Sequence, residues 1–170
     1  MNIPVKSTSA ILAYKALDRN VGKFWIDWAV EMLMNGFNSE YLIILAGISS
    51  PYDQFELQTI AEKVFNELGL DYSDKYLTIK NYVAYLCETG LEESLNIDST
   101  LKILRKFRDL YLDLDYDYLQ YFYCLYYGVE DLQYDVVQWY VDGLDRSNIF
   151  EVVKDYFRKW IDENHVLKNN

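Results

Sequence analysis

Three aspartates at alternate positions, Asp113, Asp115 and Asp117, are the residues of this chain whose type and spacing most suggest chemistry. Carboxylates at this spacing begin the calcium loop of an EF-hand, which also needs a glycine at its sixth position and a glutamate at its twelfth. Those positions hold Tyr118 and Cys124, so the sequence does not predict an EF-hand. A looser cation site on these carboxylates is left open, although an acidic run is more often a solvated face.

Other residues that carry catalysis or bind cofactors are scarce. His165 is the one histidine, so neither a His-based metal cluster nor a buried Ser–His or Cys–His pair is expected. The chain has no Gly-rich phosphate loop of the GxGxxG or GxxxxGK type. Paired carboxylates could perform acid–base catalysis, but nothing in the sequence constrains where a substrate would bind. We therefore predict a protein that is not an enzyme, with no catalytic residue, no metal site and no cofactor.

The aspartates belong to a region, residues 109–145, that combines acidic with aromatic side chains. It holds nine Asp or Glu residues and no Lys or Arg, which gives it a charge of −9 within a total of −11. A field of this sign repels nucleic acid and anionic lipid and attracts basic proteins. Tyrosine suits contact surfaces because it offers a large area with few rotatable bonds. The predicted partner-binding residues are Asp113, Asp115, Tyr116, Asp117, Tyr118, Tyr121, Tyr127, Glu130, Asp131, Tyr134 and Asp135.

A second interpretation remains for the tyrosine-rich helix predicted from about Asp117 to Tyr127. It could be a central core helix whose phenol hydroxyls find hydrogen-bond partners at its edges. Burying every ring beside so many acids would demand many hydrogen bonds, so we expect part of the segment to be exposed. The tryptophans, in contrast, are predicted in the core from their spacing: Trp25, Trp28, Trp139 and Trp160.

Apolar residues at helical spacing predict the elements that position these side chains. The predicted helices cover residues 24–33, 39–46, 53–68, 79–87, 99–114, 117–127, 132–140 and 147–161. Ser39 or Asn38, Asp53, and Asp98 or Ser99 are the expected caps at helix starts. Glycines are expected to end five of the helices, because glycine enters the left-handed conformation at low cost. They are Gly36, Gly47, Gly69, Gly90 and Gly128.

These elements predict an all-α fold. We expect about seven to nine short antiparallel helices, in a compact bundle or a HEAT-like stack. The length fits a single helical domain over residues 1–170, with a frayed tail at 165–170. Cys87 and Cys124 lack metal or redox spacing and are expected as buried free thiols in a cytoplasmic protein. The apolar runs are too short to span a bilayer.

Residues 28–56 carry a pattern of packing and turn residues, namely Ala29, Met32, Leu33, Gly36, Ser39, Leu42, Leu45, Ala46, Pro51 and Glu56. In this pattern they resemble a set of small uncharacterised bacterial all-helical proteins. The shared pattern is an Ala-containing helix ending Met-Leu-x-x-Gly, then Ser-x-x-Leu-x-x-Leu-Ala, then a proline turn and a Glu-bearing helix. These are mainly packing and turn positions, so the resemblance identifies no active site. The overall composition is also similar to that of bacterial immunity proteins, which are small, acidic and rich in aromatic residues.

Together these features predict a non-enzymatic bacterial protein-binding domain with an acidic, tyrosine-rich surface. The specific hypothesis is an immunity protein that masks a basic toxin such as a nuclease. A basic protein is the expected partner, neither nucleic acid nor membrane is expected, and a homodimer is left open. The alternatives are a helical-repeat adaptor, a self-associating structural domain, and a helical protein whose acids line a cation or small-molecule pocket.

Overall fold

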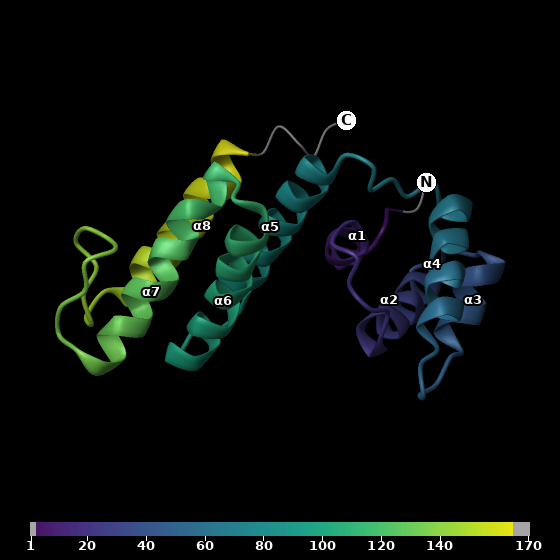
Figure 1. Ribbon diagram of the computed structural model, residues 1–170, viewed down its shortest axis with the longest axis horizontal. Coiled ribbons are helices and arrows are strands. Elements are labelled where there is room, and N and C mark those ends of the chain that lie inside the picture. The colour runs from purple at the N-terminus through teal and green to yellow at the C-terminus, as the bar shows by residue number, and fades with distance from the viewer. Residues whose placement is uncertain (1–2, 165–170) are drawn as a thin grey trace. The chain divides into compact units, whose positions relative to one another are not determined.

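The computed structural model describes residues 3–164, and this part of the chain is all-helical, with eight α-helices, one short 3-10 helix (η1) and no strand (Figure 1). The predicted all-α class is confirmed. The tail predicted at 165–170, which includes His165, lies outside the described residues. The elements are α1 (Thr8–Ala16), α2 (Lys23–Met34), α3 (Glu40–Ala46), α4 (Gln54–Leu68), α5 (Lys75–Glu92), α6 (Ile97–Leu114), η1 (Asp117–Leu119), α7 (Gln120–Tyr134) and α8 (Ile149–Glu163).

Contacts within the chain group it into two compact units, Met1–Tyr85 and Leu86–Asn170, and the boundary between them falls inside α5. The expectation of a single domain over 1–170 stays a prediction. No helix in the described part of the chain is long and apolar enough to cross a membrane. Both cysteines are free thiols, with Cys87 buried and Cys124 half-buried.

Two tryptophans of α2 form the centre of the first unit. Trp25 and Trp28 are buried and pack against Phe65 of α4, with ring centroids 6.0 and 6.3 Å away. Trp28 donates its indole N–H to the Thr8 hydroxyl of α1 at 2.9 Å, which satisfies a polar group inside the core. α3 packs against both α2 and α4. The predicted core positions of these two tryptophans are confirmed.

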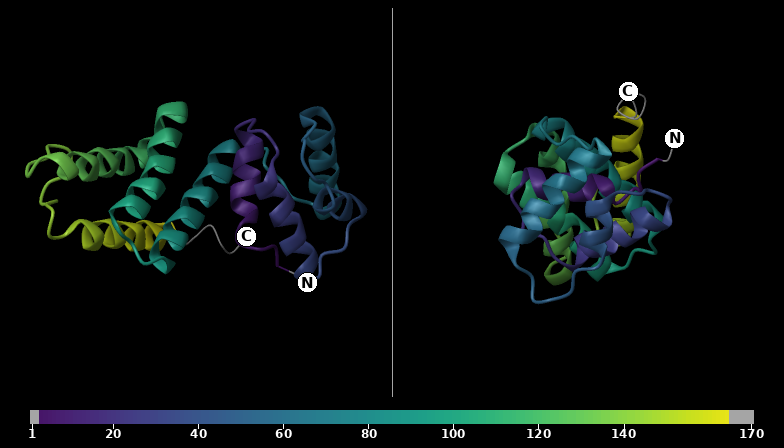
Figure 2. Two further views of the ribbon diagram at one scale, coloured as in Figure 1. Left: turned by 90° about the horizontal axis from the view of Figure 1, so that it is seen from below. Right: turned by 90° about the vertical axis from the view of Figure 1, so that its right-hand side faces the viewer.

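The second unit has an aromatic core shared by α6, α7 and α8. Phe107 of α6 and Phe122 of α7 stack with centroids 4.1 Å apart and planes inclined by 13°. Phe157 of α8 lies 5.7 Å from Phe107, and Trp160 lies 6.2 Å from Phe122. All four rings are buried, so this cluster fixes which side chains of α7 remain near the surface. α7 and α8 run in opposite directions, and the loop that joins them lies at the end of the pair (Figure 2).

Several helices begin and end as the sequence predicts. Gly36 and Gly69 follow α2 and α4 with φ of 86° and 63°, a left-handed backbone that favours glycine. Ser39 and Asp53 cap α3 and α4, because their side chains accept hydrogen bonds from backbone N–H groups of the first turn. At these four positions the local sequence is sufficient to predict where a helix begins or ends.

Two glycines that we predicted at helix ends lie inside helices instead. Gly90 is within α5, where an added Cβ would meet the Phe157 ring at 2.5 Å. Gly128 is within α7, where a Cβ would meet Leu144 Cδ2 at 2.9 Å. Both glycines therefore allow a neighbouring side chain to approach the helix closely. The predicted end of the tyrosine-rich helix before Gly128 is wrong, because α7 continues to Tyr134.

The start of α6 and the segment after α7 also differ from the prediction. The N-cap of α6 is Asn96, and Ser99 is its partner in a capping box, with both side chain to backbone hydrogen bonds at 2.9 Å. The helix predicted over 132–140 does not form: α7 ends at Tyr134, and residues 135–148 form a loop. α8 begins slightly later than predicted, at Ile149.

Candidate protein-binding surface

The three alternating aspartates lie where α6 ends and η1 begins. Asp113 is in the last turn of α6, Asp115 caps that helix with φ of 52°, and Asp117 opens η1. Aspartate tolerates this left-handed backbone because its short polar side chain can form local hydrogen bonds. All three are exposed. Among the described residues no group of three or more His, Cys, Asp or Glu could hold a metal ion, so the looser cation site has no structural support.

Tyrosine rings from α6, α7 and the following loop contact one another in a row. Tyr111 lies 4.9 Å from Tyr123, Tyr123 lies 4.9 Å from Tyr127, and Tyr127 lies 5.5 Å from Tyr140, measured between ring centroids. Such aromatic pairs contribute about 0.5–1.5 kcal/mol beyond their buried area. Tyr140 is exposed and the other three are half-buried, so the row orders its rings while leaving part of them accessible.

Among the tyrosines of α7, Tyr126 is the one that belongs to the core. It is buried, and its hydroxyl donates to the Glu130 carboxylate at 2.7 Å. The Arg108 guanidinium lies 4.4 Å from the ring centroid and pairs with Asp109 at 2.6 Å. Burial, and then the hydrogen bond to Glu130, raises the pKa of Tyr126 above its ordinary value, which keeps the phenol neutral. Glu130 and Asp109 thus already have partners within the chain.

Other tyrosines of this region contact α8 rather than α6. Tyr121 stacks at 4.2 Å on Tyr156 of α8 and is 40% exposed. Tyr118 of η1 lies 5.6 Å from Tyr116 and 6.4 Å from Trp160. These rings extend from the core of the second unit towards its surface. Tyrosines on at least two sides of α7 therefore remain accessible.

None of the eleven predicted partner-binding residues is buried. Because they run from the end of α6 through the 15 residues of α7, they are spread over about 22 Å of helix and do not form one compact cluster. Six of them are exposed: Asp113, Asp115, Asp117, Tyr121, Tyr134 and Asp135. Five are half-buried: Tyr116, Tyr118, Tyr127, Glu130 and Asp131.

The loop after α7, residues 135–148, carries aromatic and aliphatic side chains that the sequence did not predict at the surface. Trp139 is 91% exposed, so its predicted place in the core is wrong. Tyr134 is 86% and Val136 is 70% exposed. Asp135, Asp142 and Asp145 of the same loop are also exposed. We call the exposed apolar and aromatic residues of this loop, together with Tyr134 at the end of α7, the loop tip; they are Tyr134, Val136, Val137, Trp139 and Tyr140.

The side-chain amide of Gln138 holds this loop in shape. Its oxygen accepts hydrogen bonds from the backbone N–H groups of Tyr140 and Val141 at 2.8 and 2.9 Å. Its nitrogen donates to the carbonyls of Val141 and Leu144. Val141 and Leu144 are buried, and Gly128 of α7 leaves the space that Leu144 and Gln138 occupy. One side chain therefore satisfies the backbone groups that a helix or sheet would otherwise satisfy.

Side chains also fasten the loop to the two helices. Arg146 donates to the Leu132 carbonyl in the last turn of α7 at 2.7 Å, a favourable place for a cation. Asn148, next to α8, donates to the Gly143 carbonyl at 2.8 Å and accepts from the backbone N–H of Asp145 at 2.9 Å. Hydrogen bonds from the Ser147 hydroxyl and backbone N–H lower the pKa of Asp145 below its ordinary value.

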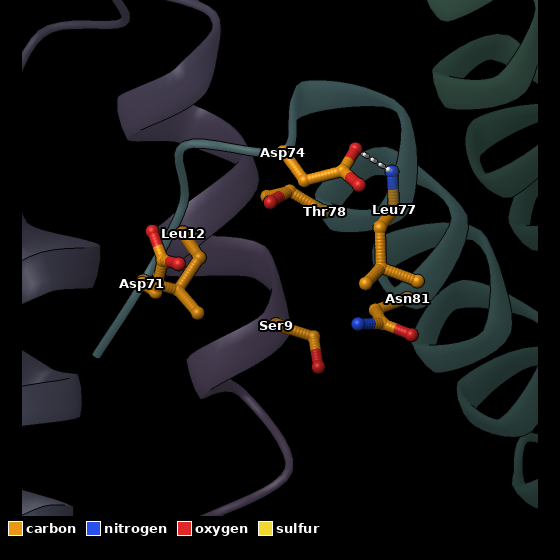
Figure 3. A pocket seen from close by; sticks show the side chains of 7 residues that line it. All are labelled: Ser9, Leu12, Asp71, Asp74, Leu77, Thr78 and Asn81. Carbon is orange, nitrogen blue, oxygen red and sulfur yellow. Dashed lines mark hydrogen bonds between the residues drawn. The ribbon is translucent and has the colours of Figure 1, made fainter. Parts of the chain in front are cut away.

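A small pocket in the first unit is a second place where a ligand could bind (Figure 3). Its volume is about 180 Å³, below the roughly 300 Å³ at which ordinary ligand pockets begin. Asp74 accepts a hydrogen bond from the backbone N–H of Leu77 at 3.0 Å and so caps α5. None of the predicted site residues lines this pocket. The lining residues are Ser9, Leu12, Asp71, Asp74, Leu77, Thr78 and Asn81.

Comparison of the chain with protein-family models, with curated proteins and with solved structures finds no match. The resemblance of residues 28–56 to small bacterial helical proteins therefore stays a prediction. The proposed function therefore rests on the chemistry of the surface formed by α6, α7 and the loop after α7.

Proposed function

We propose that this protein is a non-enzymatic protein-binding domain whose partner is a basic protein. The observation that carries the proposal is the composition of residues 109–145, with nine acids and no Lys or Arg. The exposed carboxylates of Asp113, Asp115 and Asp117 and the accessible tyrosine rings of α7 support it. We call the exposed and half-buried side chains of residues 109–145 the acidic aromatic surface.

Binding would proceed in two stages with different physical origins. Long-range attraction between the carboxylates and a cationic partner raises the rate of encounter, and salt screens it over about 8 Å at physiological ionic strength. Aromatic side chains then lose water against the partner and slow its dissociation, because tyrosine and tryptophan are common among the residues that dominate interface energies. The division predicts that charge variants alter mainly association and aromatic variants mainly dissociation.

A basic toxin, such as a nuclease, is a specific partner with this chemistry, and the protein would then act as its immunity protein in the bacterial cytoplasm. The alternative of a self-associating or helical-repeat adaptor domain receives less support. Two copies that meet through residues 109–145 would bring −9 against −9. Like charges placed opposite one another disfavour such a contact.

The aspartates at the end of α6 provide the test. Asp113→Asn, Asp115→Asn and Asp117→Asn together remove three charges with little change of shape. The matched control, Glu40→Gln, Glu93→Gln and Asp162→Asn, removes three exposed carboxylates outside the acidic aromatic surface. Both triple variants have a formal charge of −8 in place of −11, so they differ only in where the charge was lost.

Each full-length protein is immobilised and exposed to a lysate of its source organism at low ionic strength. We expect the wild type and the control to retain the same proteins of pI above about 9, eluted by salt. We expect the 113/115/117 variant to bind them with an association rate lower by about tenfold. Equal retention by all three proteins, or retention of no basic protein, would overturn the proposal.

A further inference from the structure

The contacts that hold the loop in shape do not explain why the exposed side chains of the loop tip are apolar. The loop is held by Gln138, Val141 and Leu144 on its inner side and by Arg146 and Asn148 at its ends. The tip side chains take no part in these hydrogen bonds. Large apolar side chains gathered at an exposed site mark an interaction surface more often than they serve stability.

The tip is also preorganised. The Gln138 side chain accepts two and donates two hydrogen bonds that fix the backbone just after Trp139, and Gly128 lets the loop pack closely on α7. A loop fixed before binding loses less conformational entropy when it binds, so more of its contact energy appears as affinity. Trp139, Tyr134 and Tyr140 of the loop tip belong to the residue types that dominate interface energies.

The charge around the loop tip indicates which kind of partner would bind there. Asp135, Asp142 and Asp145 lie in the same loop, and residues 109–145 hold no Lys or Arg. A tryptophan flanked by carboxylates fits an apolar pocket with Lys or Arg at its rim, since the cations pair with the carboxylates and also contact the indole face. A second copy of the chain would oppose the same three acids, and anionic lipid headgroups would be repelled.

We propose that the loop tip is the anchor of the complex, with Trp139 entering an apolar pocket of a basic protein and Asp135 and Asp142 pairing with Lys or Arg at the rim. This inference rests on the proposed function and adds to it the residue that holds the complex and the kind of pocket that receives it. The carboxylates at the end of α6 then steer the encounter, and the tip sets the lifetime.

Trp139→Ala tests the anchor, and Phe55→Ala is its matched control. Phe55 of α4 is 86% exposed, so each variant deletes one large, solvent-exposed aromatic ring and neither creates a cavity in the core. Binding is measured as association and dissociation rates against each basic protein that the wild-type chain retains. We expect Trp139→Ala to raise the dissociation rate by about 30-fold or more with little change in association. Phe55→Ala should match the wild type.

Gln138→Leu tests the preorganisation separately, because it changes none of the residues of the loop tip. We expect faster hydrogen exchange at the Tyr140 and Val141 amides and an affinity lower by about tenfold. Unchanged affinity in a variant with fast exchange would show that the shape of the loop is irrelevant to binding.

The outcomes separate the two proposals. If the 113/115/117 variant loses binding but Trp139→Ala does not, the proposed function stands and the anchor falls. If neither variant changes binding, or no basic protein is retained, both fall. A Trp139-dependent partner of low pI would overturn the cation-rimmed pocket. Trp139-dependent binding to phosphatidylcholine vesicles, or a Trp139-dependent dimer in light scattering, would assign the tip to a membrane or to a second copy and overturn the inference.

Discussion

Single tyrosines of the second unit belong partly to the core and partly to the surface. Tyr126 is buried with its hydroxyl on Glu130, whereas Tyr121 stacks on Tyr156 and remains 40% exposed. A phenol tolerates both situations, because its ring is apolar and its tip is polar. The tyrosine-rich helix therefore places one tyrosine in the core and leaves others at the surface, at different positions.

Trp139 should be the tryptophan that ionic quenchers reach. The other three tryptophans are at most 4% exposed, and Trp139 is 91% exposed in a loop that also carries the exposed Asp135, Asp142 and Asp145. Those carboxylates concentrate caesium and repel iodide. We expect the ratio of caesium to iodide quenching to exceed that of free N-acetyltryptophanamide, and Trp139→Phe to remove most of the quenching by both ions. Quenching that survives Trp139→Phe would mean that the indole is covered.

Tyr72 should make the first unit sensitive to alkali. Burial, and then its hydrogen bond to Glu62 at 2.6 Å, raises the pKa of Tyr72 to about 12 from an ordinary 10.0. The neutral phenol's contribution to stability is therefore complete below pH 10.0 and is lost as the pH rises through about 12. Urea unfolding across this window should show a fall in stability that is smaller in Tyr72→Phe. Tyr134→Phe, which removes an exposed hydroxyl, should follow the wild type.

At the level of helices and loops, the structure of a segment depends on its tertiary contacts as well as on its own sequence. The amphipathic helices and the caps at Ser39 and Asp53 are predictable because the signal is local. α1 was not predicted, since its buried residues include only one large aliphatic, Ile11, and form a weak stripe. Gly36 and Gly90 are indistinguishable in sequence, although one ends a helix and the other receives a ring from α8.

The loop after α7 shows the same limit for the candidate site. Its apolar residues follow a helical spacing, so sequence alone favours a helix with Trp139 inside. The shape comes instead from Gln138, a polar residue whose four backbone hydrogen bonds no periodicity reveals. The acids and tyrosines of the candidate surface could therefore be predicted from composition, whereas four of the five residues of the loop tip could not.

Gly90→Ala should destabilise the second unit although alanine favours helices. The gain in helix propensity is about 1 kcal/mol, and overpacking costs about 1–3 kcal/mol. Overpacking should win, because the new Cβ would lie 2.5 Å from a Phe157 ring that Phe107 and Phe122 enclose. We expect a net loss of about 1 kcal/mol or more in urea unfolding.

Gly47→Ala is the control for this prediction, because the nearest atoms to its Cβ would lie 3.6 Å away at ordinary contact distance. Its effect should stay within about 0.5 kcal/mol. A stabilised Gly90→Ala variant would show that the α8 ring can move aside.

For the molecule as a whole, charge is divided unequally between the two units. Residues 1–85 hold seven Lys or Arg and ten Asp or Glu, a net −3, whereas residues 86–170 hold nine and seventeen, a net −8. The excess lies almost entirely within 109–145. Concentrated charge of one sign opposes the compact state through self-repulsion, so the candidate surface carries a cost in stability.

Salt should therefore stabilise the protein. Between about 10 and 150 mM ionic strength the Debye length falls from about 30 to 8 Å, which screens repulsion among the exposed acids. We expect the free energy of unfolding to rise by about 1 kcal/mol, the size of a few exposed charge interactions. The 113/115/117 variant should show a smaller rise than the control triple variant of equal net charge. Equal rises would mean that the position of these carboxylates does not matter.

The construction of the loop after α7 separates two kinds of position. Gln138, Val141, Leu144 and Gly128 build it from within, and Tyr140 adds a ring contact with Tyr127, whereas the Trp139 side chain is 91% exposed and takes no part in these contacts. An exposed residue such as Trp139 can therefore be exchanged, by mutation over generations or by a designer, without refolding the backbone beneath. Under the proposed function, such an exchange would change which partner pocket the loop tip fits while the scaffold stays the same.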